Sequence, residues 1–517
     1  MTAVIGQRFH CPPVVLLSLL AGGLMLPLAL APVPLNDSHW INLTWSEQFT
    51  ALMRHGVIWP RWLPWSHDGL GAPVFYFYGP VAFWAAGLLG LIGLGTWPSL
   101  LGAAFVGLAC SGIAMHAFLR GYSKRPLLGA AFYMAAPYHL LDFARRGALA
   151  EFTAITLLPL VAIGIRRAVR GRPAILAAGY AMLIMAHLPI ALLASIFLIP
   201  MVSLVEDGAN KIGITRIVAG LVLGIGIAAA YLLPALVLQP FTAMLTMQGA
   251  PLLRPANWTV ATFFHGGVPG LLLLAAIVLA LAVTAAILLA KRWDAWGIFV
   301  LGMLGLGLGL FPPVWRIPPL DHVQFPWRIL SLAEFGTAVL VARSHLARPQ
   351  LLLACFLPLL LSTLVLEASL TAIGTTSSGA TRQMQSLLRH HPDVVEYLPS
   401  GHGESGGSQS VWALKLAART PQVQYADGMT TLRRFVFPIW RIRCASGLIP
   451  STASQDGLLR YRGQGCAIEQ TKPLAEQLGL AISLAALLLT LLTAVRPPIA
   501  WIHAIGRRAR MPAESRL

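Results

Sequence analysis

Long apolar segments, separated by short polar loops, constrain the fold of this chain more than any other feature. Hydrophobic residues make up 57% of the 517 residues, charged residues only 11%, and the mean hydropathy is +0.71. A soluble protein of this size has too little interior to bury that much apolar surface, so lipid must solvate most of it. The apolar segments are continuous and do not alternate with polar residues, which argues against a β-barrel. We therefore predict an all-α polytopic membrane protein.

The net charge of +18 reflects the membrane and not a nucleic acid. Most Lys and Arg residues lie in short loops between apolar segments, as the positive-inside rule predicts. We therefore expect the bilayer as a partner and no nucleic acid. No small-residue cleavage site follows the first apolar segment, so we expect it to be a retained helix and not a removed signal peptide.

The distribution of basic residues predicts the topology. With both ends inside, the cytoplasmic loops and tail hold 19 of the 37 basic residues, the short outside loops seven, and the C-terminal polar segment eleven. This distribution requires one apolar segment not to cross; we favour 74–94, which contains Gly79-Pro80, and 127–141 is the alternative. About twelve spans remain: 13–34, 98–119, 127–141, 151–165, 173–187, 188–205, 214–237, 267–290, 295–312, 329–345, 350–370 and 477–495.

The chain divides into three predicted regions. Residues 1–370 form a transmembrane domain with a long first outer loop, 35–97. Residues 371–476 contain Gly/Ser-rich linkers and short strand-like stretches, which predict a small extracytoplasmic β-rich domain. Residues 477–517 form a final span and a basic cytoplasmic tail. Cys444 and Cys466 lie in the β-rich segment, where an oxidising compartment favours a disulfide between them.

Ionisable residues collect on the predicted outer face. An ionisable residue near a membrane segment is costly and usually faces a cavity or a functional site. An ordinary aromatic belt, or an Arg–Glu pair closing a helix hairpin, is the alternative explanation of these residues. Glu334 lies within a span, and His187 lies between two spans. The other candidates form three clusters: the first is Asp37, His39, Arg61, His67 and Asp68, the second is Arg145, Arg146 and Glu151, and the third is Asp321, His322 and Arg328.

The ordered motifs resemble the GT-C superfamily of polytopic membrane glycosyltransferases. More closely, the chain is similar to two bacterial groups, the "6-pyruvoyl-tetrahydropterin synthase-related" and the YfhO-like membrane proteins. Nothing in the sequence indicates a pterin enzyme. The resemblance rests on five stretches spread over almost the whole chain: "NDSHW", "GVIWPRWLPWSHDGLGAPVFYFYGPVAFW", "PYHLLDFARRGALAEF", "QFPWR" and "FPIWRIRCASG".

This resemblance implies transfer of a sugar from a polyprenyl-phosphate donor to an extracytoplasmic glycan, lipid or protein, at the bacterial inner membrane. Asp37 matches the acid of the first outer loop and would be the catalytic base, with His39 orienting it or binding the sugar. Ser38-His39 occupies the place of a second acid, so no metal or other cofactor is expected. Phosphate would bind arginines, whose planar group can hold two oxygens; these are Arg145, Arg146, Arg328 and Arg61. The remaining cavity candidates are His67, Asp68, Glu151, Asp321 and His322.

Two other classes of function fit the same composition. A lipid or oligosaccharide transporter also needs polar groups facing a cavity, but along a path through the bilayer. The ionisable residues here gather at the outer rim, which favours chemistry at one face. A non-catalytic membrane scaffold with a partner-binding β domain is the third class.

Overall fold

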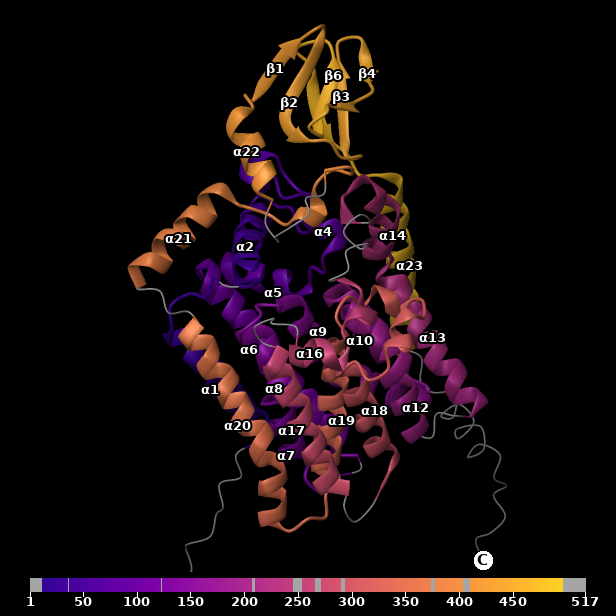
Figure 1. Ribbon diagram of the computed structural model, residues 1–517. Helices are drawn as coiled ribbons and strands as arrows, with labels where there is room; N and C mark the ends of the chain where they lie inside the picture. The colour runs from indigo at the N-terminus through magenta and orange to yellow at the C-terminus, as the bar shows by residue number, and fades with distance from the viewer. Residues whose placement is uncertain are drawn as a thin grey trace, which may run out of the picture.

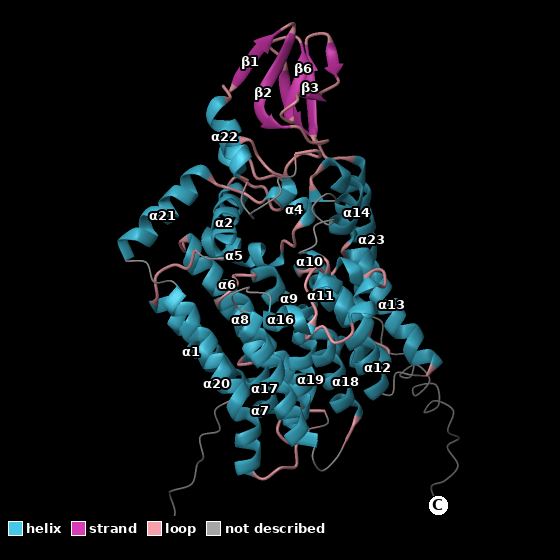
Figure 2. Ribbon diagram, in the orientation of Figure 1, coloured by secondary structure: helices cyan, strands magenta, loops and turns pink. Residues whose placement is uncertain are grey.

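The structure is a computed structural model that describes residues 12–495, except 36, 122, 207–209, 245–252, 266–270, 290–292, 373–376 and 403–409. Helices form most of the described chain, and the strands gather at one end of the helical body (Figure 1). Figure 2 shows helix α22 (Val411–Arg419) between that end and the helices of the first outer loop.

Within the described residues, six helical segments are long and apolar enough to cross a membrane. A seventh is possible if the bent pair α13 (Lys211–Ile227) and α14 (Ala229–Leu238) forms one span. The chain is therefore a multi-pass membrane protein. The six are α1 (Pro13–Leu30), α6 (Thr96–Leu119), α9 (Leu149–Val169), the run α11–η1–α12 (Leu188–Leu193, Ala194–Leu198, Ile199–Val205), α20 (Arg348–Ala372) and α23 (Leu474–Val495).

The count of full-length spans is smaller than the twelve expected, because several apolar segments form shorter helices. Four of these are only 10–17 residues long within the described chain, and at 1.5 Å per residue they fall short of a hydrocarbon core about 30 Å thick. Three of them lie in expected spans and are α10 (Ala174–Ala186), Leu273–Leu289 within α17 (Leu271–Leu289), and α18 (Ala295–Gly307). The fourth, α5 (Val81–Leu91), lies in the segment 74–94, which was not expected to cross. Helix α19 (Leu330–Arg343) is also short.

Neither of the two segments considered as non-spanning forms one continuous helix. Residues 74–94 form α4 (Val74–Phe77) and α5, with extended backbone at Tyr78 and a break at Gly79-Pro80. Gly79 lies so close to the end of α10 that a Cβ there would be 2.2 Å from the Ala186 carbonyl oxygen. The segment 127–141 is divided between α7 (Pro126–Met134) and α8 (Pro137–Ala144). Proline at the start of each helix supplies no backbone donor, which favours a helix beginning there.

The segment 35–97, predicted to be the first outer loop and kept under that name, forms an ordered layer in its described residues. Its main element is α2 (His39–Arg54), which packs against α5 and buries Leu43 and Phe49. Gly87 and Gly90 of α5 permit this close approach, since a Cβ at either would be under 3 Å from an α2 side chain. The loop continues through α3 (Ser66–Gly69).

The C-terminal region contains the antiparallel β structure expected from the sequence. One sheet has the order β1-β2-β6-β5, with β1 (Val423–Ala426), β2 (Met429–Phe435), β5 (Thr452–Ala453) and β6 (Leu458–Arg462). The other has the order β4-β3-β7, with β4 (Gly447–Ile449), β3 (Trp440–Cys444) and β7 (Ala467–Gln470). The residues before the strands are helical, with α21 (Ser377–His390) ahead of α22, because their apolar residues recur at helical spacing.

A second hydrophobic core joins the β region to the first outer loop. It contains Trp62, Leu70 and Tyr76 of the loop together with Phe435 and Phe437 of the β region. Trp62 and Phe437 have ring centroids 5.9 Å apart, and the Phe435 amide donates to the Leu70 carbonyl at 2.8 Å. Two segments about 370 residues apart in sequence therefore form one folded unit.

Cys444 and Cys466, the pair singled out in the sequence, form a disulfide between β3 and the start of β7. The bond closes a loop with a sequence separation of 22 residues. Because such a cross-link restricts the unfolded chain, Cys444→Ser is expected to reduce the stability of the β region by about 3 kcal/mol. Chemical unfolding in detergent measures this, and dithiothreitol should reproduce the loss in proteins that keep the disulfide while having no further effect on Cys444→Ser. Cys110→Ser, which removes a free cysteine, is the matched control; equal stability of both variants would contradict the prediction.

Candidate functional site

Asp37 lies at the start of the first outer loop, immediately before α2. Its backbone is in the left-handed region, with a φ of 45°, a conformation that Asp tolerates better than most residues. The side chain is 53% exposed, and its Oδ2 lies 3.1 Å from Nη1 of Arg145, which is 33% exposed. The carboxylate is therefore accessible from solvent and already paired with a cation.

His39 is buried behind Asp37, against the turn between α8 and α9. Gly147 in that turn has a φ of +65°, and a Cβ there would be 2.6 Å from the His39 backbone nitrogen. Only glycine meets both requirements. The Ser38 backbone amide donates to the Arg146 carbonyl at 3.0 Å, and the side-chain Nδ2 of Asn42 donates to the Gly147 carbonyl. These contacts fix the start of α2 to the α8–α9 turn.

Glu151, in the first turn of α9, is the centre of a buried polar cluster. It accepts hydrogen bonds from the Tyr138 hydroxyl at 2.6 Å and from Nε of Arg328 at 3.1 Å. Nη1 of Arg146 lies 3.4 Å from Glu151 and 2.5 Å from Asp142. We call Tyr138, Asp142, Arg146, Glu151 and Arg328 the Glu151 network. Its two arginines balance its two carboxylates, which allows charge to be buried beside membrane helices. The Asp37–Arg145 pair adjoins this network, because Arg145 precedes Arg146 in the chain.

Glu334 supports this network from α19. It is fully buried and accepts the backbone N–H groups of Tyr138 at 2.6 Å and His139 at 3.0 Å. These are orphan donors at the N-terminus of α8, where a carboxylate is also favoured by the helix dipole. Glu334 therefore positions α8, which carries Tyr138 and Asp142.

Tyr138 and Asp142 belong to this network but were not among the site residues predicted from the sequence. Asp142 is four residues before Arg146, a spacing that pairs charges on one helix face and could have revealed it. Tyr138 gives no comparable signal, because a tyrosine in an apolar stretch resembles an ordinary membrane-interface residue.

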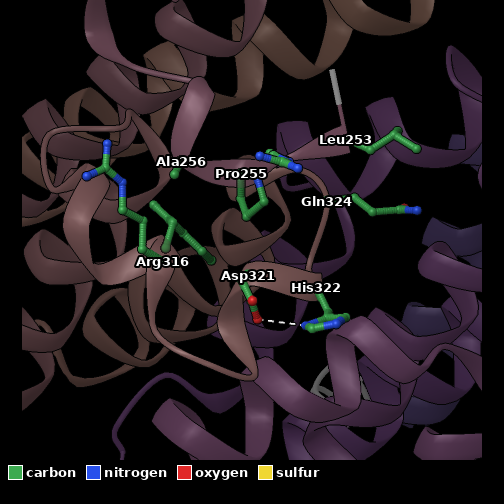
Figure 3. Close-up of a pocket in the computed structure, with 9 residues that line it drawn as sticks. Leu253, Pro255, Ala256, Arg316, Asp321, His322 and Gln324 are labelled. Carbon is green, nitrogen blue, oxygen red and sulfur yellow. Dashed lines mark hydrogen bonds and ion pairs between the residues drawn. The ribbon is translucent and has the colours of Figure 1, made fainter. Parts of the chain in front are cut away.

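Asp321 and His322 line a cavity of about 350 Å³ with Arg254 and Arg316. Figure 3 shows the Asp321 and His322 side chains turned toward each other, facing the segment that carries Pro255; Oδ1 of Asp321 lies 2.6 Å from Nδ1 of His322. The cavity lies among the short turns η4 (Pro255–Asn257), η5 (Pro312–Arg316) and η6 (Leu320–His322). Gln324 joins it to the Glu151 network, since its side-chain oxygen accepts from Nη1 of Arg328 at 3.1 Å.

Arg61 lies among other partners. It donates to the Ala230 carbonyl at 2.7 Å, lies 3.5 Å from Glu476 at the start of α23, and stacks over Trp59 at 3.7 Å. These contacts attach the first outer loop to α14 and α23.

His67 and Asp68 lie at the junction of the loop with the C-terminal region. Both have left-handed backbone, and His67 packs against Phe435 with ring centroids 5.7 Å apart. Burial lowers the pKa of His67 to about 3, so this imidazole is neutral near pH 7. Asp68 pairs with Arg433 at 3.0 Å and with His390 at 3.4 Å.

The described residues contain no group of three or more His, Cys, Asp or Glu side chains that could hold a metal ion. The expectation of no cofactor stays a prediction. The side chains of the Glu151 network supply carboxylate, guanidinium and phenol groups.

Asp393 fixes the segment after α21 to α2. It is fully buried, and its Oδ1 accepts from Nε1 of Trp45 at 3.0 Å and from the Val394 amide at 2.7 Å. Burial raises the pKa of this carboxyl to about 7, whereas in an unfolded chain it is about 4. Between these pH values the folded protein binds the proton and the unfolded chain does not, so stability falls as the pH rises.

Asp393→Asn should remove this component of the pH dependence, because the amide keeps the Oδ1 acceptor and has no charge to bury. Unfolding midpoints of both proteins at pH 5 and pH 8 measure the effect. We expect the variant to gain stability relative to the wild type at pH 8. An identical pH profile for the two proteins would contradict the assignment.

Comparison with models of known protein families finds no match, and comparison with curated proteins finds none. Among solved structures, the chain is similar to two cryo-EM structures of arabinofuranosyltransferase AftD from Mycobacteria, the second of a mutant. Each is 15% identical in sequence, with TM-scores of 0.41 and 0.42. The matches cover 75% and 74% of this chain but only 27% and 28% of AftD, so the chain spans less than a third of that protein.

Proposed function

We propose that this protein is an integral-membrane glycosyltransferase that moves a sugar from a polyprenyl-phosphate donor to an extracytoplasmic acceptor. The acceptor is a cell-envelope glycan, lipid or protein, and the membrane is the bacterial inner membrane. In this proposal the shorter apolar helices complete a twelve-span topology, with the β region outside and both ends of the chain in the cytoplasm. One observation carries the proposal: an accessible carboxylate, Asp37, pairs with Arg145 at the edge of a buried arginine–carboxylate network.

Sugar transfer needs a base for the acceptor and positive charge for the leaving group. The acceptor hydroxyl oxygen bonds to the anomeric carbon and gives its proton to Asp37. The bond between the anomeric carbon and the phosphate oxygen breaks, and its electron pair leaves with polyprenyl phosphate. Each of these steps uses only groups present in the chain and the two substrates.

Arg145 links donor binding to the activation of Asp37. In the structure its guanidinium neutralises the carboxylate at 3.1 Å, and both groups are partly exposed. A donor phosphate competes for Arg145 because it offers more negative charge and more acceptor oxygens. Once Arg145 turns to the phosphate, Asp37 is released as an unpaired carboxylate able to accept a proton.

Arg146 and Arg328 have a different role, because Asp142 and Glu151 already balance their charges. They hold the end of α8 and the turn before α9 in place, so that Arg145 is positioned for the donor phosphate before the reaction begins. Gln324 extends this contact to the cavity that Arg254 and Arg316 line, which gives the donor headgroup a second polar surface. His39 positions the turn that carries Asp37, and Arg61 anchors the loop to α14 and α23.

The proposal is tested with purified protein in lipid nanodiscs, supplied with radiolabelled polyprenyl-phosphate sugars and a cell-envelope extract as acceptor. Label should move from the polyprenyl-phosphate donor to a new glycan, lipid or protein product only when both substrates are present. In sealed vesicles, movement of intact labelled lipid between leaflets without a new glycosidic bond would identify a transporter instead. If the label is neither transferred nor moved between leaflets, the proposal is overturned and the scaffold function remains.

A further inference from the structure

A second pocket lies at the junction of three segments that are far apart in the sequence. It is an open cavity of about 460 Å³. We call it the junction pocket; α2, the α3 loop, the end of α21 and strand β2 supply its lining, which is Glu47, Trp65, Asp68, Gly69, Arg389, His391 and Arg433. None of these residues belongs to the Glu151 network.

The junction pocket offers hydrogen-bond donors and acceptors side by side. Oε2 of Glu47 lies 2.5 Å from Nε2 of His391, and Asp68 pairs with Arg433. Trp65 is 41% exposed and has its ring centroid 5.9 Å from that of His391. A sugar ring presents hydroxyls that both donate and accept, and C–H faces that pack on an aromatic ring. The lining matches those requirements.

The loop that carries Asp68 is held in an unfavourable backbone conformation. His67 and Asp68 have φ values of 54° and 56°, and Gly69 and Gly71 follow at 92° and 81°. Left-handed backbone at two successive non-glycine residues costs on the order of 1–3 kcal/mol each and persists only where surrounding contacts maintain it. Here Arg433 donates to both the carbonyl and the side chain of Asp68, at 2.8 and 3.0 Å. The β region thus fixes the direction of this carboxylate.

The charges of the lining indicate which kind of ligand the junction pocket can take. The two carboxylates in the lining would repel a phosphate, and the many charged groups make the pocket unfavourable for an apolar ligand. A hydroxyl-rich ligand satisfies both conditions.

The junction pocket and Asp37 are connected by one rigid helix. Glu47 is eight residues beyond His39, the first residue of α2, so the rise along the helix separates these two by about 12 Å, and Asp37 lies two residues before the helix begins. A ligand that contacts both places must be an extended chain and not a single sugar unit. We propose that the junction pocket binds a distal sugar unit of a glycan acceptor while the hydroxyl that reacts lies at Asp37. Binding of a sugar unit in the junction pocket is independent of the proposed function, whereas reaction of the acceptor hydroxyl at Asp37 rests on it.

Binding alone tests the first half. Isothermal titration of the full-length protein in detergent uses four linear oligosaccharides, hexamers of glucose, mannose, galactose and N-acetylglucosamine. We expect at least one to bind the wild type. Trp65→Ala and Asp68→Asn should each weaken that binding at least tenfold; Asn also tolerates left-handed backbone, so folding is preserved. Trp293→Ala, which removes an exposed tryptophan elsewhere, should bind as the wild type does.

The kinetics test the second half. Trp65→Ala should raise KM at least tenfold for an oligosaccharide acceptor, with kcat unchanged, and should leave a monosaccharide acceptor unaffected because it is too short to reach the pocket. Binding to none of the four oligosaccharides, or equal binding by wild type, Trp65→Ala and Asp68→Asn, would overturn the inference. If oligosaccharide binds as expected but no sugar is transferred, the proposed function fails and the carbohydrate site stands.

Discussion

Replacing Asp37 with Asn is expected to reduce sugar transfer at least 100-fold while leaving the yield and the unfolding midpoint of the protein unchanged. A general base contributes about 10²–10⁴ in rate, and the amide cannot accept the proton. Asn has nearly the same shape and also tolerates the left-handed backbone found at this position. The measurement is the initial rate of label transfer in nanodiscs at saturating acceptor.

The matched control for this prediction is Asp456→Asn in the β region. Asp456 is 45% exposed and lies 3.4 Å from Arg419, an environment close to that of the Asp37–Arg145 pair. This variant removes an exposed aspartate–arginine pair without touching the Glu151 network, so transfer should continue at the wild-type rate. Full activity of Asp37→Asn would remove Asp37 as the base.

Replacing Glu151 with Gln should be the most destabilising single change in the chain's polar clusters. Glu151 is the shared partner of Arg146 and Arg328, and all three lie in or beside membrane helices. Removing one member of a buried ion cluster leaves uncompensated charge and costs about 3–5 kcal/mol. We expect a lower unfolding midpoint in detergent and loss of transfer in the same preparation.

Glu469→Gln serves as the control for that loss of stability. Glu469 pairs with Arg443 on the exposed face of the small β3–β7 sheet, at 2.8 Å, where solvent screens the charges. Its removal should leave the unfolding midpoint unchanged. If Glu151→Gln is as stable as this control, then the buried arginines do not depend on Glu151, and the Glu151 network does not act as one unit.

Several features of the fold follow from local sequence. Continuous apolar segments determine membrane helices, because every backbone polar group in lipid must be paired within its own segment. Gly79-Pro80 interrupts one such segment, as expected from the missing donor of proline. Alternating apolar residues around Trp440 and Ile442 produce strand β3.

The number of full-length spans was not predictable in the same way. Hydropathy measures how apolar a segment is, whereas the length of a helix also depends on what packs against its ends. At Gly79 and Gly309 the backbone approaches another segment within 2.2 Å of where a Cβ would be, and these close contacts help to break apolar runs into shorter helices. Such contacts are formed between segments distant in sequence.

The sequence by itself determined that this chain is a multi-pass membrane protein and which of its residues are too costly to lie beside lipid without a partner. Only the tertiary structure decided which residue each of these charged side chains pairs with. Arg145 lies against Asp37, Arg146 and Arg328 share Glu151, and Arg61 lies apart from them. The physical reason is that the cost of burying a charge belongs to one residue, while the pairing that offsets it depends on residues brought together from distant parts of the chain.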